Sequence, residues 1–485
     1  MPDLAQLGAP SWVATVLLVI DYLIKIVAIG VVPENRRPSS STAWLLLILL
    51  LPYVGLPLFL LIGSPYIQGR RHTIQANANA ELLARADALP ALPSEIDDPE
   101  YFSGVVQMNR DLGSLPCVGG TPVGLYPHYE ECIEAMTTAV HEAKRTVHFE
   151  IYILALDATT EPFFDAMAAA VKRGVKVRLL YDHIGSHGYP GYHRMNRRLT
   201  ADGIDWHQML PIKPLRGRWR RPDLRNHRKL LVVDDEIGFM GSQNMIDSSY
   251  LKRANVRIGR AWQDCNVAVR GDIVDELALV FALDWYTETG ERLRVPDEMQ
   301  SGETAMQALP SGPGFTTDPN LRLFNTLIYS AERRLTIVSP YFIPDESLLM
   351  AVTSAAHRGV EVELFASEKA DQFMVHHAQR SYYRALLEAG VKIWLYPAPT
   401  VLHSKFLTVD EEVSVIGSSN MDMRSFHLDY EISLMVFGSD FVGDLQEVAD
   451  EYRAVSKYIE LEEWNRRPWP GRYVDNVMRL TSALQ

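Results

Sequence analysis

One pattern of chemically active residues occurs twice in this sequence. NHRKLLVVDDEIGFMGSQN spans residues 226–244, LHSKFLTVDEEVSVIGSSN spans residues 402–420, and both read His-x-Lys-x4-Asp-x6-Gly-Ser-x-Asn. Two copies of so long a pattern indicate an internal duplication. Each copy supplies one imidazole, one ammonium group and several hydroxyl and amide groups that can form hydrogen bonds.

Two such half-sites facing each other would form a catalyst for substitution at phosphorus. In-line displacement needs a nucleophile on one side of the phosphorus atom and an acid for the leaving oxygen on the other. Imidazole can take either role near pH 7, so His227 and His403 are the candidates. The paired lysine, serine and asparagine side chains would neutralise the phosphate oxygens without a metal. These residues are Lys229, Ser242, Asn244, Lys405, Ser418 and Asn420.

Strand geometry separates the roles within each copy. Residues two apart in a strand point to one face, so the histidine and the lysine of each copy project together. The same parity places the motif aspartates, Asp234 and Asp410, on the opposite face or at a hairpin tip, where VDDE and VDEE are typical of turns. The returning strand then brings Gly-Ser-x-Asn beside the histidine, with small residues that let a ligand approach the backbone.

Each catalytic histidine also needs a carboxylate that orients its second ring nitrogen. Asp264 follows the first copy and Glu431 follows the second, and each opens a strand of alternating residues. We therefore expect Asp264 and Glu431 to support the histidines, one in each half.

The elements that must position these residues also repeat. A strand, a helix and a second strand precede each motif in the same order, which predicts an α/β fold of two duplicated sandwich units with pseudo-two-fold symmetry. The runs are TVHFEIYIL, EPFFDAMAAAVKRG and VKVRLLYD in the first half and RLTIVSPYFIP, ESLLMAVTSAAHRG and VEVELFAS in the second.

Composition divides the chain into five parts. We expect a membrane anchor over residues 1–72, a connector with some helix over 73–115, a first α/β unit over 116–298, a linker rich in Gly, Pro and Ser over 299–319, and a second unit with a C-terminal amphipathic helix over 320–485.

The predicted anchor contains two apolar stretches, at about residues 12–32 and 43–63. Each is long enough to cross a hydrocarbon core of ~30 Å at ~1.5 Å per residue. Asp21 and Lys25 share one helix face, where an ion pair would lower the cost of burial. Pro52, Gly55 and Pro57 in the second stretch predict a kinked or a re-entrant segment. These features indicate a transmembrane helical hairpin and a multi-pass membrane protein.

Composition also limits the function classes. A net charge of −13 argues against a nucleic-acid binder, and three cysteines without paired spacing exclude a disulfide framework and favour the cytoplasmic side of the membrane. The basic residues among 213–229, with Trp219, predict contact with anionic lipid headgroups. Three loop histidines fit no zinc-ligand spacing, so we expect neither metal nor cofactor. They are His183, His187 and His193.

The repeated motif resembles the phospholipase D superfamily over nearly everything after about residue 111. The resemblance implies a metal-independent reaction through a covalent phosphohistidine, with His227 as nucleophile and His403 as general acid. It also implies that Asp234 and Asp410 belong to the active-site set.

The anchor and the second half narrow the resemblance to bacterial cardiolipin synthases, through RRPSSSTAWLLLILLLPYVGLPLFLLIG, PYFIPD, SSNMDMRSFHLDYE and EEWNRRP. That family implies an enzyme of the bacterial inner membrane that transfers a phosphatidyl group between two phosphatidylglycerol molecules. Asp429 stands where an asparagine is expected. A membrane-bound phospholipase D that releases phosphatidic acid, a nuclease and a non-catalytic lipid binder are the alternatives.

Overall fold

The computed structural model describes most of the chain. The described residues are 11–34, 38–63, 100–212, 221–294, 302–315 and 317–482. They divide into two compact units. One contains the described part of residues 1–72 together with Arg221–Asp223, and the other contains the remaining described residues.

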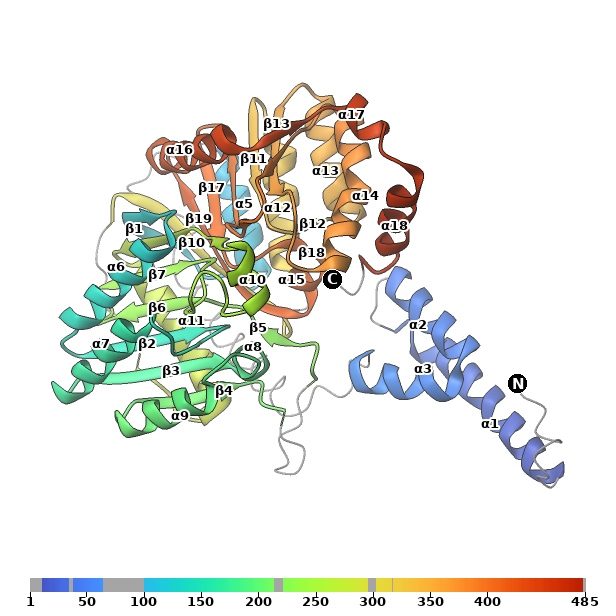
Figure 1. The fold of residues 1–485 in the computed structure, drawn as a ribbon, viewed down its shortest axis with the longest axis horizontal. Coiled ribbons are helices and arrows are strands. Elements are labelled where there is room, and N and C mark those ends of the chain that lie inside the picture. The colour runs from blue at the N-terminus through green and yellow to red at the C-terminus, as the bar shows by residue number, and fades with distance from the viewer. Residues whose placement is uncertain are drawn as a thin grey trace. The chain divides into compact units, whose positions relative to one another are not determined.

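The N-terminal unit is helical (Figure 1). Its elements are α1 (Ser11–Val31), α2 (Pro38–Leu50), α3 (Pro52–Leu58) and the π-helical turn η2 (Phe59–Gly63). Asp21 and Lys25 form the predicted ion pair, with 2.8 Å between Oδ2 and Nζ. α2 ends just before Pro52, because a proline ring has no N–H to continue the helix, so the predicted kink is confirmed.

Within the described residues, no helix is both long and apolar enough to cross a membrane. The two membrane-spanning helices therefore remain a prediction.

The larger unit is built on one mixed β-sheet with two short accessory sheets (Figure 1). The strands of its first half are β1 (Cys117–Tyr126), β2 (Thr146–Ile151), β3 (Lys176–Asp182), β4 (Asp205–Met209), β5 (Arg225–Asn226), β6 (Leu230–Val233), β7 (Ile237–Gly241), β8 (Trp262–Gln263) and β9 (Asn266–Arg270). Those of the second half are β10 (Thr304–Ser311), β11 (Arg334–Val338), β12 (Phe342–Ile343), β13 (Glu361–Ser367), β14 (Lys392–Tyr396), β15 (Val401–Leu402), β16 (Phe406–Val409), β17 (Val413–Gly417), β18 (Met421–Asp422), β19 (Asp429–Phe437) and β20 (Lys457–Ile459).

The strand order repeats outward from the middle of the sheet. β1 and β10 pair antiparallel there, with Cys117 opposite Gln307. From β10 the order is β19, β17, β16, β11, β13 and β14, and from β1 it is β9, β7, β6, β2, β3 and β4. β20 adds an outer strand beside β14. Both halves therefore share one continuous sheet, and the strand order agrees with the duplication seen in the sequence.

Helices cover both faces of this sheet. They are α5 (Glu100–Asp111), α6 (Tyr129–Glu142), α7 (Glu161–Lys172), α8 (His183–His187), α9 (Tyr192–Ala201), α10 (Arg253–Ile258), α11 (Ile273–Thr289), α12 (Pro319–Ser330), α13 (Glu346–His357), α14 (Phe373–Ala389), α15 (Met423–His427), α16 (Ser439–Val455), α17 (Leu461–Asn465) and α18 (Trp469–Arg479). α11 and α16 pack on one face, and α6, α7, α12, α13 and α14 pack on the other.

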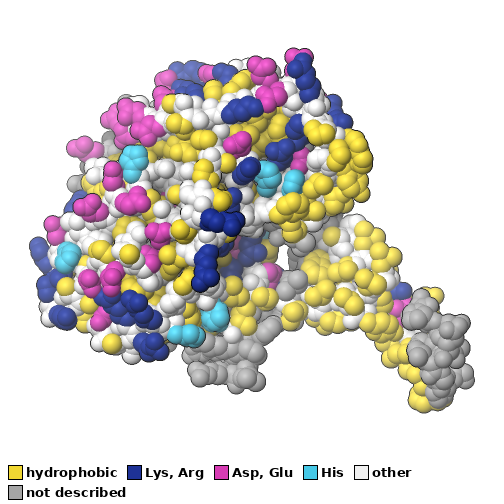
Figure 2. Space-filling model, in the orientation of Figure 1, with side chains coloured by type: hydrophobic (Ala, Val, Ile, Leu, Met, Phe, Trp, Pro, Cys, Tyr) yellow, Lys and Arg dark blue, Asp and Glu magenta, His cyan; other side chains and the backbone are white. Residues whose placement is uncertain are grey.

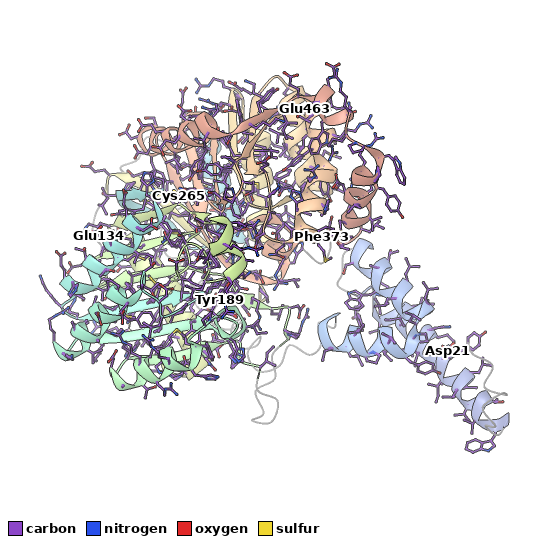
Figure 3. The ribbon with its side chains drawn as sticks, viewed as in Figure 1. Asp21, Glu134, Tyr189, Cys265, Phe373 and Glu463 are labelled. Carbon is purple, nitrogen blue, oxygen red and sulfur yellow. The ribbon has the colours of Figure 1, made fainter. Side chains whose placement is uncertain are left out.

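The alternation of side chains along β6 shows why the sheet needs two layers of helices. Leu230 and Val232 enter the core beneath α11, whereas Leu231 and Val233 enter the core beneath α6 and α7. Cys265, labelled in Figure 3, is buried in the first of these cores, and Cys117 and Cys132 are also buried and unpaired.

The predicted strand–helix–strand runs are confirmed as β2, α7 and β3 and as β11, α13 and β13. Two boundary predictions are wrong. β10 lies inside the predicted linker 299–319 and pairs with β1 and β19, and its residues from Ala305 to Ser311 are all buried, as in a strand at the centre of a covered sheet. α5 lies inside the predicted connector 73–115, yet Phe102 and Val106 pack into the core of the second half. Residues 73–99 lie outside the described residues.

Candidate active site

Two very short strands bring the motif histidines together. β5 leads directly into His227 and pairs in parallel with the start of β19, and the His227 N–H donates to the Tyr430 carbonyl at 2.8 Å. β15 leads directly into His403 and pairs in parallel with β8, and the His403 N–H donates to the Gln263 carbonyl at 2.7 Å. Each histidine is therefore hydrogen-bonded, through its backbone, to the opposite half of the chain.

The carboxylate that orients each histidine also comes from the opposite half of the chain. His403 Nδ1 lies 2.6 Å from Asp264 Oδ1, and His227 Nδ1 lies 2.9 Å from Glu431 Oε1. Both predicted carboxylates therefore contact a motif histidine. The expectation that each serves its own half is wrong, because β5 and β15 pair with strands of the other half. All four side chains are buried.

The motif serines hold these carboxylates rather than facing open space. Ser242 Oγ donates to Asp264 Oδ1 at 2.6 Å, and Ser418 Oγ donates to Glu431 Oε2 at 2.5 Å. The glycine before each of these serines allows neighbouring strands to pack closely. At Gly417 a Cβ atom would collide with the backbone of β19, and at Gly241 it would collide with Cys265 and Asn266.

The motif lysines lie in equivalent positions. Lys229 Nζ donates to the carbonyl of His227 and Lys405 Nζ donates to the carbonyl of His403, both at 2.6 Å. Burial lowers the pKa of both ammonium groups, and that of Lys405 falls to about 8. The exchange of carboxylates joins the two half-sites in one cluster, in which the charge of Lys405 lowers the pKa of Lys229 further. The cluster concentrates positive charge where the phosphate of a substrate would lie.

The motif asparagines differ between the halves. Asn244 is used structurally, because its Oδ1 accepts from Ile153 N–H at 3.1 Å and its Nδ2 donates to the Tyr250 hydroxyl at 2.8 Å. Asn420 Oδ1 is buried and has no hydrogen-bond partner within the described part of the chain. A phosphate-binding role therefore stays a prediction for both residues, and Asn420 retains the greater capacity for it.

The two histidines have different electrostatic surroundings. Burial lowers the pKa of His227, and Lys229, Lys405 and His403 lower it further. Burial and Lys405 lower the pKa of His403 too, but the charge and hydrogen bond of Asp264 oppose this change.

The pKa values of the two orienting carboxylates are shifted in opposite directions. Burial alone would raise the pKa of Asp264, but its contacts with His403, Lys405 and Ser242 outweigh burial and lower it. Burial raises the pKa of Glu431 to about 7. At neutral pH, Asp264 is therefore ionised and supports a proton on His403, while Glu431 gives weaker support for a proton on His227.

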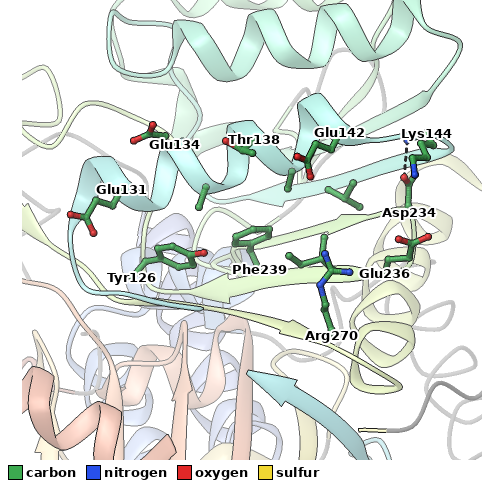
Figure 4. A pocket seen from close by; sticks show the side chains of 14 residues that line it. Tyr126, Glu131, Glu134, Thr138, Glu142, Lys144, Asp234, Glu236, Phe239 and Arg270 are labelled. Atoms are coloured by element: carbon green, nitrogen blue, oxygen red, sulfur yellow. Dashed lines mark hydrogen bonds between the residues drawn. The ribbon is translucent and has the colours of Figure 1, made fainter. Parts of the chain in front are cut away.

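The motif aspartates lie at hairpin tips, as strand parity predicts and unlike the position that the family resemblance implies. The Asp234 carboxylate accepts from the backbone N–H groups of Lys144, Arg145 and Thr146 at 2.7–2.8 Å (Figure 4). The Asp410 carboxylate accepts from those of Glu332, Arg333 and Arg334 at 2.7–3.0 Å. Both residues have positive φ, 56° and 52°, which aspartate tolerates in turns. Their contacts fix the chain that enters β2 and β11.

Figure 4 also shows a groove between α6 and the strands beside this first hairpin. Glu131, Glu134, Glu142 and Arg270 line it, and neither motif histidine does.

Several residues near His227 were not anticipated. Asp182, at the end of β3, accepts from the N–H groups of Asn226 at 3.0 Å and Gly185 at 2.8 Å and pairs with Arg225 at 3.2 Å. It thereby fixes β5. Its position at the carboxyl end of a parallel strand is the sequence signal that could have identified it.

Aromatic and charged side chains complete this side of the site. The Tyr152 ring meets the His227 ring edge-on, with 5.0 Å between centroids, and Lys229 Nζ lies 5.5 Å from the centre of the same Tyr152 ring. Asp429 forms a two-point ion pair with Arg424, with Nε–Oδ2 and Nη2–Oδ1 distances of 3.1 and 3.2 Å. The charge that Asp429 adds is therefore neutralised locally.

The remaining predicted features lie at the periphery or outside the described residues. His183 and His187 belong to α8, with ring centroids 5.6 Å apart, and His193 belongs to α9. Of the predicted basic strip 213–229, residues 213–220, including Trp219, lie outside the described residues.

Comparison with known proteins gives a consistent result. The family described as "Cardiolipin synthase, PLD-like domain" matches residues 136–285 and 324–453, and that described as "Phospholipase_D-nuclease N-terminal" matches residues 13–64. Cardiolipin synthase of Geobacillus kaustophilus is 33% identical over 468 residues, covering 94% of this chain and 91% of the relative. Cardiolipin synthase A of Proteus mirabilis is 32% identical, covering 93% of this chain and 94% of the relative.

Among solved structures, phosphatidylserine synthase of Haemophilus influenzae matches with a TM-score of 0.58 at 15% identity, covering 79% of this chain and all of that one. This likeness concerns the fold.

Proposed function

The chain belongs to the cardiolipin synthase family of phospholipase D-like proteins, and we propose that it joins two phosphatidylglycerol molecules into cardiolipin with release of glycerol. One observation carries this proposal. Both histidines of the repeated motif lie in one buried cluster with two lysines, and each histidine has a carboxylate on its Nδ1. This arrangement leaves both Nε2 atoms for chemistry at phosphorus.

We assign the first step to His227. Its Nε2 attacks the phosphorus of the donor phosphatidylglycerol, and the bond from phosphorus to the terminal glycerol oxygen breaks. His403 Nε2 gives its proton to that oxygen, so glycerol leaves and a phosphatidyl group remains on His227. The difference between the two carboxylates supports this assignment, because ionised Asp264 opposes the lowering of the His403 pKa and so makes His403 easier to protonate than His227.

The second step reverses the proton transfer. The terminal hydroxyl of an acceptor phosphatidylglycerol loses its proton to His403 and attacks phosphorus, the bond from phosphorus to Nε2 breaks, and cardiolipin leaves. Lys229 and Lys405 stabilise the negative charge on the non-bridging oxygens in both steps.

We further propose that residues 1–72 attach this enzyme to the bacterial inner membrane, with the larger unit on the cytoplasmic side. The apolar side chains that α1 exposes support this attachment, because exposed Leu, Ile and Val are costly in water. The exposed residues of α1 include Trp12, Leu18, Leu23, Ile26 and Ile29.

The purified full chain, incubated with phosphatidylglycerol and analysed by mass spectrometry, tests the activity. We expect cardiolipin and glycerol in equal amounts. Phosphatidic acid as the main lipid product would instead make the chain a phospholipase D, and absence of both products would overturn the proposal. The His227→Ala variant is the control for contaminating activity.

A further inference from the structure

A basic and apolar lobe stands at the edge of the active site. The segment from Ser249 to Ala261 leaves the site after the first motif, forms α10, and returns as β8, which leads directly into Asp264. Its base is closed by the Trp262 N–H, which donates to the Ser248 carbonyl at 2.9 Å. The second half has a shorter connection at the equivalent place, formed by β18 and α15.

The base of this lobe belongs to the site wall. The Tyr250 hydroxyl accepts from Asn244 of the first motif, and the Tyr250 and Trp262 rings contact each other with 4.3 Å between centroids. Within the lobe, Asn255 is buried and its Nδ2 donates to the Ser249 carbonyl at 2.9 Å. α10 is therefore held in a defined position at the mouth of the site.

The outer surface of the lobe combines two kinds of side chain. Val256 and Ile258 are 61% and 48% exposed. Lys252, Arg253 and Arg257 are exposed beside them, and no acidic residue occurs from Ser248 to Gln263 in a chain of net charge −13. Figure 2 shows Lys and Arg side chains gathered over α10.

A second group of exposed apolar side chains lies near the same active site. Phe373 and Met374, in the first turn of α14, are 64% and 41% exposed (Figure 3). They follow Asp371, whose carboxylate accepts from the Tyr341 hydroxyl at 2.6 Å. Tyr341 leads directly into β12, which pairs with β18, and β18 directly follows Asn420 of the second motif. α10 and the start of α14 therefore share one active-site rim.

We propose that this rim docks on the surface of an anionic lipid bilayer and so holds the mouth of the site against its lipid substrate. The proposal rests on the proposed function, which requires an anionic phospholipid to enter a buried cluster. Exposed aliphatic and aromatic side chains insert at the level of the headgroups, and lysine and arginine bind anionic headgroups. The charge of the lobe is complementary to phosphatidylglycerol and gives no attraction to a zwitterionic surface.

A single fluorescent label tests the docking directly. All three native cysteines are buried, so a Val256→Cys variant of the full chain can be labelled selectively with an environment-sensitive dye. Tyr329→Cys is the control, because Tyr329 is 47% exposed in the last turn of α12. The chain from α12 enters β11 beside Asp410, at the end of β16 away from His403. Both proteins are reconstituted in vesicles of phosphatidylcholine alone and with phosphatidylglycerol added.

We expect the dye at position 256 to brighten at least twofold and shift to the blue only with phosphatidylglycerol, and the dye at position 329 to remain unchanged. Equal signals at both positions, or equal responses to both lipids, would overturn the proposal. The same brightening in detergent without bilayers would also overturn it, because it would indicate a protein contact.

Measurements of turnover in bilayers and in detergent micelles distinguish a docking role of the lobe from a catalytic role. The triple variant Lys252→Gln, Arg253→Gln, Arg257→Gln should lose roughly tenfold or more of its activity on phosphatidylglycerol in bilayers and less than twofold on phosphatidylglycerol in detergent micelles. A matched triple variant at the amino ends of β3 and β11, Lys172→Gln, Lys176→Gln, Arg333→Gln, should keep its activity on both substrates. Equal losses on both substrates by the first triple would overturn docking. If the unmodified chain forms no cardiolipin in either medium, the proposed function itself fails.

Discussion

His403 and Asp264 come from opposite halves of the chain, and their Nδ1 and Oδ1 atoms lie 2.6 Å apart. His227 and Glu431 repeat the relationship in reverse. Each half of the duplicated fold therefore supplies a histidine and receives the carboxylate that orients it. Neither half contains a complete catalytic pair, which gives a physical reason for both halves to remain in one continuous sheet.

Replacing Asp264 by asparagine should reduce kcat on phosphatidylglycerol roughly 10³-fold, because His403 loses the charge that stabilises its proton. Asp264 acts through His403, so the first release of p-nitrophenol from a donor with that leaving group, which needs no proton, should slow less than tenfold. Steady-state kinetics on phosphatidylglycerol and the pre-steady-state burst of p-nitrophenol test this. Equal losses on the two donors would show that Asp264 does not support the general acid.

Replacing Asp234 by asparagine should lower the stability of the fold and leave kcat unchanged. Its carboxylate accepts three backbone N–H groups before β2, and weakening them should cost roughly 1–3 kcal/mol in the free energy of unfolding. Thermal unfolding and kcat below the transition are the measurements. Asp235→Asn is the matched control, because Asp235 has the same positive φ in the same turn. A loss of kcat with an unchanged melting temperature would instead place Asp234 in the chemistry.

Glu431 should make folding stability depend on pH. Its pKa is raised to about 7 in the folded state, so the folded form binds its proton more tightly than the unfolded form does. Stability from this group is complete below the unfolded pKa of about 4.3 and is lost as pH rises toward 7. Relative to the native chain, Glu431→Gln should therefore gain up to roughly 3 kcal/mol in unfolding free energy between pH 4.5 and pH 7.5. Chemical denaturation of both proteins at these two pH values tests the sign. A constant difference would contradict the raised pKa.

Asp429→Asn should preserve the placement of Arg424 and change the pH profile. An asparagine oxygen can still accept from Arg424, but it cannot carry the negative charge that offsets the positive charge of Arg424, and that positive charge lowers the pKa of His227. We expect activity at the optimum to stay within about threefold and the profile to move roughly 0.5 unit toward acid. A move toward alkaline pH, or Asp429→Ala behaving identically, would contradict this account.

The sequence pattern predicted those features that depend on local periodicity. The β6–β7 hairpin, the apolar run 230–233 and the turn position of Asp234 all follow from alternation and turn chemistry. The pairing of Asp264 with His403 could not be predicted, because β5 and β15 contain two residues each and carry no period. The central position of β10 was missed for a similar reason, since Gly312 and Gly314 after the strand resemble a linker.

We propose that the two motif histidines have different roles, with His227 attacking phosphorus. Quenching the full chain during turnover of phosphatidylglycerol and mapping the modified peptide by mass spectrometry identifies the nucleophile. We expect a phosphatidyl adduct on His227 and none on His403. An adduct on His403, or turnover with no adduct on either histidine, would contradict it.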